Sequence, residues 1–150
     1  MDRSIRLTQT LTLLGALPFL ALAIGHAAGL ELRLAGDLPP GSLARAFLAY
    51  GAVIASFMAG TIWMQAEIHT LKVTLLLLLS NAIALLVFAT LILPMPLVLA
   101  LLVQAACFIL ALGCDSVSYR VGRQKPWYFR LRCLVTLIVL CAYLVMLVAG

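Results

Sequence analysis

The chain has 150 residues, of which 65% are hydrophobic and 10% are charged, and its mean hydropathy is +1.20. A soluble domain carries about 25% charged residues, and one of this length has too little interior to bury so much apolar surface. The composition excludes an ordinary soluble domain and predicts a membrane protein. The net charge of +5 does not indicate a nucleic-acid-binding protein, because no polar face remains for a groove-reading element.

Five segments are apolar and long enough to cross a bilayer, which takes about 20 residues. None alternates strictly between polar and apolar residues, so we expect helices, which satisfy their own backbone groups in lipid, and not a barrel. The sequence predicts one all-α domain over residues 1–150. It is an integral membrane bundle of five transmembrane helices, at about residues 7–30, 43–66, 73–93, 97–116 and 129–149.

The first predicted helix begins like a signal peptide, because Arg3 and Arg6 precede its apolar run. A signal-peptide core is about 7–15 residues long, and this run is longer. We therefore expect the segment to stay in the protein as its first span.

The first two predicted helices each carry a row of small residues at four-residue spacing. Small side chains in such a row let two helices approach closely. We expect the two rows to pack against each other, and a functional groove lined by Ser56 and Trp63 is the alternative. The rows are Ala21, Gly25 and Gly29 in the first helix, and Ala52, Ser56 and Gly60, followed by Trp63, in the second.

The third and fourth predicted helices are joined by a tight turn at Pro94-Met95-Pro96, and each contains one amide side chain. Asn81 precedes the turn by about 13 residues and Gln104 follows it by about 10, which brings them within roughly 5 Å in depth at 1.5 Å per residue. We expect an interhelical hydrogen bond between them. The functional alternative is that both line a polar conduction path.

Asp115 is the one acidic residue near the interior of a predicted span. An ionisable residue inside a membrane is a functional candidate by default. The simpler interpretation, which we favour, is an ion pair with Arg120, Arg130 or Arg132.

Half of the ten Lys and Arg residues lie in the connection between the fourth and fifth predicted helices or at the start of the fifth, interleaved with aromatic residues. Lys and Arg beside a span attract anionic lipids, and Trp and Tyr favour the headgroup region. We expect these residues to contact lipid headgroups, with a docking site for a soluble partner as the alternative. They are Arg120, Arg123, Lys125, Trp127, Tyr128, Arg130 and Arg132.

The distribution of positive charge predicts the orientation. Eight Lys and Arg residues fall on the side of the membrane that holds the N-terminus, and two fall on the other. Positive residues favour the cytoplasmic side, so we expect the N-terminus inside and the C-terminus outside. The short N-terminal tail lacks an Arg- and Ser-rich presequence, which favours the bacterial inner membrane over the mitochondrial one.

No reactive site is evident in the sequence. His26 and His69 fall on opposite sides of the predicted membrane, so one chain cannot hold a haem between them. The four cysteines form no metal-binding pattern, and no nucleotide-binding or hydrolase motif is present. We expect no catalytic residue, no metal and no cofactor, and a protein that is not an enzyme.

Three stretches, in order along the chain, carry a family resemblance: GALPF at Gly15–Phe19, AYGAVIASFMAGTIW at Ala49–Trp63, and WYFRLR at Trp127–Arg132, with Asp115 ending the helix before the last stretch. In these, the chain resembles the domain of unknown function 3429 family, which includes mitochondrial transmembrane protein 69. The resemblance implies a small multi-span inner-membrane protein and supplies no established activity.

The chain departs from the family pattern at three positions of the second helix. Ala59 stands in place of the first Gly of a pair, Ile62 in place of a polar residue, often His, and Met64 in place of a Gly. Any chemistry that the polar residue performs in relatives is therefore missing here.

The functional hypothesis from the sequence is a non-enzymatic accessory, assembly or structural subunit that acts through helix–helix contact. Its partners are then membrane lipids and either another membrane protein or a second copy of itself. A small transporter or channel is the alternative, and an anionic-lipid-binding membrane protein is a further one.

Overall fold

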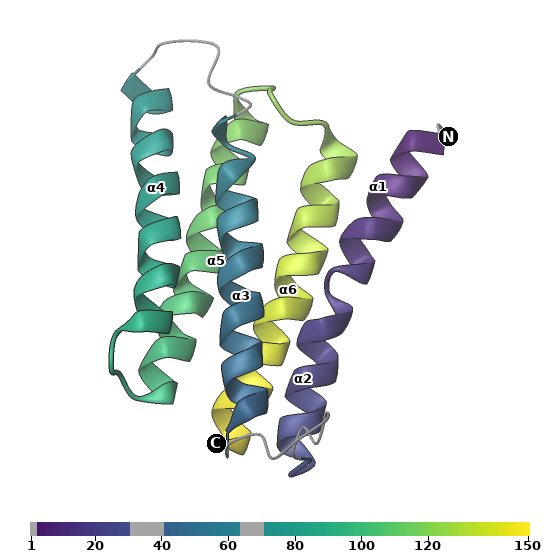
Figure 1. The fold of residues 1–150 in the computed structure, drawn as a ribbon. Helices are drawn as coiled ribbons and strands as arrows, with labels where there is room; N and C mark the ends of the chain where they lie inside the picture. The colour runs from purple at the N-terminus through teal and green to yellow at the C-terminus, as the bar shows by residue number, and fades with distance from the viewer. Residues whose placement is uncertain (1–2, 31–40, 64–70) are drawn as a thin grey trace.

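The computed structural model describes residues 3–30, 41–63 and 71–150, and every element in this part of the chain is a helix (Figure 1). The all-α prediction is confirmed, and these described residues contain five helical segments that are long and apolar enough to cross a membrane. The first of these spans, Ile5–Ala27, is built from two shorter helices in sequence. The helices are α1 (Arg3–Leu14), α2 (Leu17–Ala27), α3 (Ser42–Gly60), α4 (Leu71–Ile92), α5 (Leu97–Arg120) and α6 (Pro126–Ala149).

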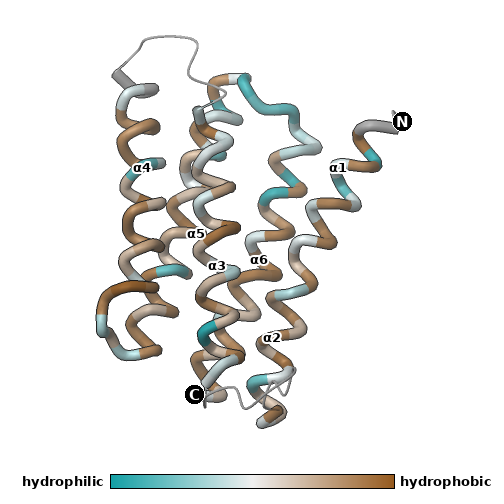
Figure 2. The backbone as a smooth tube through the Cα atoms, in the orientation of Figure 1, coloured by the Kyte–Doolittle hydropathy of each residue, from teal (hydrophilic) through white to brown (hydrophobic). Residues whose placement is uncertain are grey.

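The helices form an antiparallel bundle in which α3, α5 and α6 occupy the middle. Helix α4 packs against α3 and α5, and α2 packs against α3 and α6. Helix α1 leans away from the bundle (Figure 1). The N-terminus and the α5–α6 connection lie at one end of the bundle, and the C-terminus lies at the other. The α5–α6 connection is hydrophilic, whereas the helix bodies are mostly hydrophobic (Figure 2).

The first span is broken at Gly15 and Ala16, where a single continuous helix was predicted. Pro18 has no backbone N–H and therefore cannot bond to the Leu14 carbonyl one turn earlier. Its ring also crowds that carbonyl, and Gly15 adds a residue of poor helix propensity. Pro18 instead occupies the first turn of α2, where a missing N–H costs little. The chain therefore changes direction inside the span.

Several predicted helix ends were displaced by a few residues. Helix α5 continues to Arg120 and α6 begins at Pro126, so the basic connection is short and most of its charges sit on helix ends. Gly122, with φ of 77°, makes the turn that follows α5. The second span ends at Gly60, and the predicted extension over 64–66 lies outside the described residues.

An aromatic cluster fills the core of the bundle. The Phe19 ring lies 4.9–5.8 Å from the rings of Tyr50, Phe47 and Phe108 in edge-to-face arrangements. The ring of Tyr143 lies 4.7 Å from that of Phe47. These contacts join α2, α3, α5 and α6, so the second half of the first span is fixed to the bundle although the first half leans outward.

Candidate functional site: two polar clusters and a lateral pocket

Gln104 joins four helices from the centre of the bundle. It is fully buried on α5, and its amide nitrogen donates to the Leu48 carbonyl of α3 at 3.0 Å and to the Thr90 hydroxyl of α4 at 2.7 Å. Its amide oxygen accepts a hydrogen bond from the Tyr143 hydroxyl of α6 at 2.6 Å. We call Leu48, Thr90, Gln104 and Tyr143 the neutral cluster. Because these polar groups satisfy one another, the cluster can lie in an apolar core at little cost.

The neutral cluster depends on a glycine. A side-chain carbon added to Gly51 of α3 would lie 2.5 Å from the amide oxygen of Gln104 and closer still to the Tyr143 hydroxyl. Even a methyl group would therefore push apart the two partners of the 2.6 Å hydrogen bond. Gly51 is required here because α3 approaches α5 and α6 closely, and not because of its backbone angles.

The predicted hydrogen bond between Asn81 and Gln104 was wrong. Asn81 is exposed, and its amide donates to the Leu77 carbonyl of its own helix at 3.1 Å. The buried face of α4 instead carries Ser80, Ile83, Val87 and Thr90. Successive residues on a helix differ by about 100° in direction. Asn81 has a suitable depth but points away from α5, and the partner of Gln104 on this helix is Thr90.

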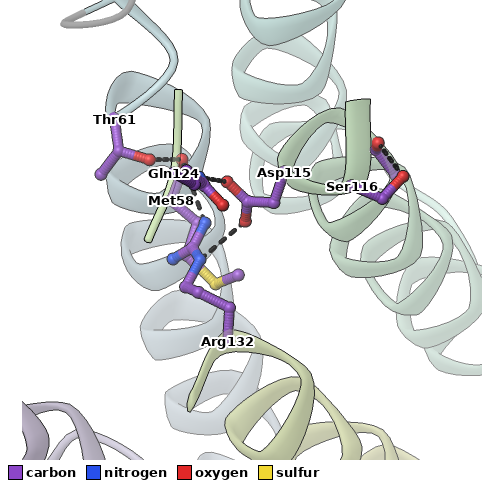
Figure 3. A network of polar contacts seen from close by, with 7 residues as sticks. Met58, Thr61, Asp115, Ser116, Gln124 and Arg132 are labelled. Atoms are coloured by element: carbon purple, nitrogen blue, oxygen red, sulfur yellow. Dashed lines mark hydrogen bonds and ion pairs between the residues drawn. The ribbon is translucent and has the colours of Figure 1, made fainter. Parts of the chain in front are cut away.

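Asp115 forms the predicted ion pair, and its partner is Arg132. The Arg132 Nε atom donates to the Asp115 carboxylate at 2.7 Å, and the Gln124 amide donates to the other carboxylate oxygen at 2.8 Å (Figure 3). Asp115 is 0% exposed and Arg132 is 5% exposed. We call Asp115, Gln124 and Arg132 the charged cluster. A charge pair this deeply buried is stable only when its remaining polar atoms are also bonded, as the Gln124 contact achieves for the carboxylate.

The end of α3 provides Arg132 with a second negative partner. The Nη2 atom of Arg132 lies 3.5 Å from the Met58 carbonyl, in the last turn of α3. This carbonyl also accepts a hydrogen bond from the Thr61 hydroxyl at 2.8 Å. Carbonyl groups in a last helical turn lack partners in the helix and carry the negative end of the helix dipole. The guanidinium therefore joins α6 to both α5 and α3.

The other residues of the basic connection remain at the surface. Arg120, Lys125 and Arg130 are exposed, as expected for side chains that contact headgroups or a partner. Arg132 was grouped with them in the sequence but is buried, because its position on α6 faces the carboxylate of Asp115. Trp127 and Tyr128 are half-buried with their rings edge-to-face, at 5.7 Å between centres. Arg123 is half-buried as well.

The predicted rows of small residues do not form the interface between the first two spans. In the first row Gly25 is buried against Leu43, whereas Ala21 and Gly29 are exposed. In the second row Ala52 is buried and Ser56 half-buried, but Gly60 is exposed with open space around it, and Trp63 is 53% exposed. The interior row of α3 is Gly51, Ala55 and Ala59, one residue earlier than predicted.

The outward lean of α1 leaves a pocket of about 340 Å³ between α1, α3 and α6. Phe57 of α3 and Leu11 of α1 line it and are 70% and 59% exposed, so the pocket opens sideways from the bundle. Arg132 and Met58 also form part of the pocket wall. They are the two residues through which the charged cluster contacts α3. Ligand-binding pockets typically measure about 300–1,000 Å³ and combine an apolar lining with a few polar groups.

A hydrogen bond holds the broken first span at the base of this pocket. The Tyr50 hydroxyl of α3 donates to the Gly15 carbonyl at 2.8 Å. Gly15 lies at the break and lines the pocket. The bond gives a partner to a backbone carbonyl that the broken helix leaves unpaired, which lipid would otherwise make costly. Two of the stretches that carry the family resemblance, GALPF and the Tyr-Gly of the second helix, therefore meet here.

Within residues 3–30, 41–63 and 71–150, no three His, Cys, Asp or Glu side chains lie together as a metal ion requires. The four cysteines are free thiols. His26 is half-buried near the end of α2, and His69 lies outside the described residues.

Fold and site together define a multi-pass membrane helix bundle with a lateral pocket. A family model described as a protein of unknown function (DUF3429) matches residues 4–148, so the chain belongs to this family. The match confirms the resemblance seen in the sequence. No curated protein and no solved structure matches the chain.

Proposed function

We propose that this protein is a non-catalytic accessory protein of its membrane, which binds an amphiphilic molecule from the bilayer in the pocket between α1, α3 and α6. The observation that carries the proposal is the position of the pocket. It opens sideways, where lipid chains surround the bundle, and not along the bundle axis. A ligand that arrives within the plane of the bilayer can enter such a pocket directly.

The break in the first span gives the pocket its form. Helix α2 is fixed to the core by Phe19, whereas α1 beyond the break touches mainly α6. A straight helix would continue along the bundle and fill this space. Because Pro18 prevents a straight helix, the opening follows from the sequence of the span itself.

The packing of the polar residues gives no support to the transporter hypothesis. Under that alternative Asn81, Gln104 and Asp115 would line a path, but Asn81 is exposed on α4. Gln104 and Asp115 are both fully buried and are bonded within separate clusters. They are eleven residues apart on α5, or roughly 16 Å, and the aromatic core packs around the neutral cluster.

A matched pair of variants on α3 tests the pocket. Ile54 lines it, whereas the neighbouring Val53 is 64% exposed and does not. Ile54→Trp places an indole in the pocket, and Val53→Trp places one on the outer surface. Native mass spectrometry of gently extracted protein should find a bound amphiphile on the wild type and on Val53→Trp, and much less on Ile54→Trp. Equal retention by the two variants would contradict the proposal.

A helix of another membrane protein is the second candidate partner, and Gly60 is the observation that favours it. Gly60 is exposed with open space around it, close to the exposed Trp63, so another helix can approach α3 there. Gly60→Leu should release a partner protein from the complex seen by native mass spectrometry while the bundle itself stays folded. A complex that survives this change does not use the α3 surface.

We further propose that the end of the bundle with the α5–α6 connection faces the cytoplasm. The excess of positive charge at this end supports the orientation. A cysteine introduced at the exposed Arg120 should react with a membrane-impermeant maleimide in inverted vesicles and not in intact cells. The reverse pattern would reverse the orientation.

A further inference from the structure

The pocket has the length and the polarity gradient of a single lipid leaflet. Its α6 wall runs from Tyr128 to Val139, which is roughly 16 Å at 1.5 Å per residue. The hydrocarbon core of a bilayer is about 30 Å thick, so the wall covers about half of it. An acyl chain from one leaflet is therefore matched in length to this wall.

The polar groups of the pocket gather toward the end that holds the α5–α6 connection. Tyr128 and Arg132 lie in the first two turns of α6, whereas Val135 and Val139 lie deeper. On α1 the threonines Thr8 and Thr12 lie nearer than Gly15 to this same end of the bundle. The deep part of the pocket therefore suits a hydrocarbon chain, and the shallow part suits a polar headgroup.

One basic residue, Arg132, lines the shallow end of the pocket. Its hydrogen bonds to Asp115 and to the Met58 carbonyl engage Nε and Nη2 of a guanidinium that carries five N–H groups. The exposed Arg130 and Arg6 lie two residues before Arg132 and Thr8, about 200° around their helices, so they add positive charge at a similar depth but outside the pocket. Planar guanidinium groups bind phosphate oxygens well, and basic residues at this depth attract anionic lipid.

We infer that the ligand of this pocket is a phospholipid with an anionic headgroup, drawn from the surrounding bilayer. One acyl chain lies against Phe19, Val135 and Val139, and the phosphate lies at the level of Arg132. This inference rests on the proposed function, because it names the amphiphile that the pocket takes. Arg132 lines the pocket, and the Asp115 carboxylate holds its guanidinium in place through the 2.7 Å ion pair.

The test is competition between two phospholipids with identical acyl chains. The protein is reconstituted into vesicles of equal parts phosphatidylglycerol and phosphatidylcholine and extracted gently, and the retained lipid is counted by native mass spectrometry. The wild type should retain phosphatidylglycerol about fivefold or more over phosphatidylcholine, since one basic residue near the surface contributes about that factor.

Two variants show whether the lipid preference comes from the Arg132 guanidinium or from the general surface charge. The double variant Asp115→Asn/Arg132→Gln removes one negative and one positive charge, so the net charge is unchanged, and it should lose the preference while still retaining lipid. Arg130→Gln removes an exposed charge and should keep most of the preference. If the double variant does not fold, Thr8→Glu serves instead, since it leaves the charged cluster intact and places a negative charge in the pocket wall.

The outcomes distinguish two claims: that the pocket binds an amphiphile, and that this amphiphile is an anionic phospholipid. Equal retention of both lipids by the wild type, abolished by Ile54→Trp, overturns the anionic ligand and leaves the amphiphile-binding function standing. Retention that Ile54→Trp does not alter overturns both. A preference that Arg130→Gln removes as fully as the pocket variants places the anionic lipid on the outer surface, and the inference is wrong.

Discussion

The charged cluster and the neutral cluster are equally buried, yet they lie in different surroundings. The neutral cluster packs against aromatic rings, and its hydrogen bonds involve only uncharged groups, including one from the Thr90 hydroxyl to the Val87 carbonyl of its own helix. The charged cluster lies closer to the end of the bundle, and Arg132 borders the pocket. A charge deep in a bilayer is expensive, whereas a satisfied amide is not. Hydrogen-bonded uncharged groups therefore join the helices at the centre of the bundle, and the charge pair lies nearer its end.

The largest expected effect comes from breaking the charge pair. Asp115→Asn leaves the Arg132 guanidinium buried without a counter-charge, which should lower the free energy of unfolding by about 3–5 kcal/mol. The double variant Asp115→Asn/Arg132→Gln removes both charges and should recover much of that loss. Unfolding by SDS titration in mixed micelles measures both. A double variant less stable than the single one would mean that the two residues do not act as a pair.

The next effect contrasts two glycines of the same helix. Gly51→Ala forces a methyl group against Tyr143 and Gln104 and should cost about 1–3 kcal/mol of stability, the usual range for overpacking. Gly60→Ala enters open space and should be neutral or stabilising by up to about 1 kcal/mol, because Ala is the better helix former. SDS unfolding of the two variants side by side is the measurement. Equal effects would show that α3 does not approach its neighbours as closely as the structure indicates.

Removing the central amide should have a somewhat smaller effect. Gln104→Leu keeps the approximate volume but removes three hydrogen bonds to α3, α4 and α6. Interhelical hydrogen bonds in membranes average about 0.6 kcal/mol each, so the total loss should be about 2 kcal/mol. The exposed Asn81→Leu is the control, and it should change the SDS midpoint little. A large effect at Asn81 together with none at Gln104 would contradict the assignment of the neutral cluster.

The smallest stability effect is expected at the link between the core and the pocket. Tyr50→Phe keeps the ring against Phe19 and removes only the hydrogen bond to the Gly15 carbonyl, for a loss of about 0.6 kcal/mol. Tyr50→Phe should reduce lipid retention more clearly than it reduces stability, because Gly15 lines the pocket and the hydrogen bond holds the break in place. Native mass spectrometry measures the lipid retention of this variant, and SDS unfolding measures its stability. Unchanged retention would mean that the pocket does not depend on this bond.

The number and approximate position of the spans could be predicted because they depend on one local property, a run of about 20 apolar residues. The Asp115 ion pair could also be predicted, because a buried acid needs a counter-charge and the basic connection is adjacent in sequence. The choice of Arg132 among three arginines could not, since it depends on the direction in which each side chain leaves its helix.

The hydrogen bond of Asn81 and the small-residue rows were predicted wrongly for one shared reason. Spacing along the sequence gives depth in the membrane and identifies residues on a common face, but it does not say which face turns inward. An error of one residue rotates the prediction by about 100°. The interior row of α3 begins at Gly51 and not at Ala52, and α4 presents Thr90 and not Asn81 to Gln104.

The sequence by itself determined that this is a five-span helical membrane protein of its family, with a basic connection before the last helix, because composition, run length and local motifs suffice for those conclusions. The same residues include Pro18, whose missing N–H breaks the first span. Only the tertiary structure decided that the break opens a pocket, that Arg132 lies in its wall, and that Gln104 joins four helices. Those features depend on the rotation and tilt of helices against one another, which packing over the whole bundle determines.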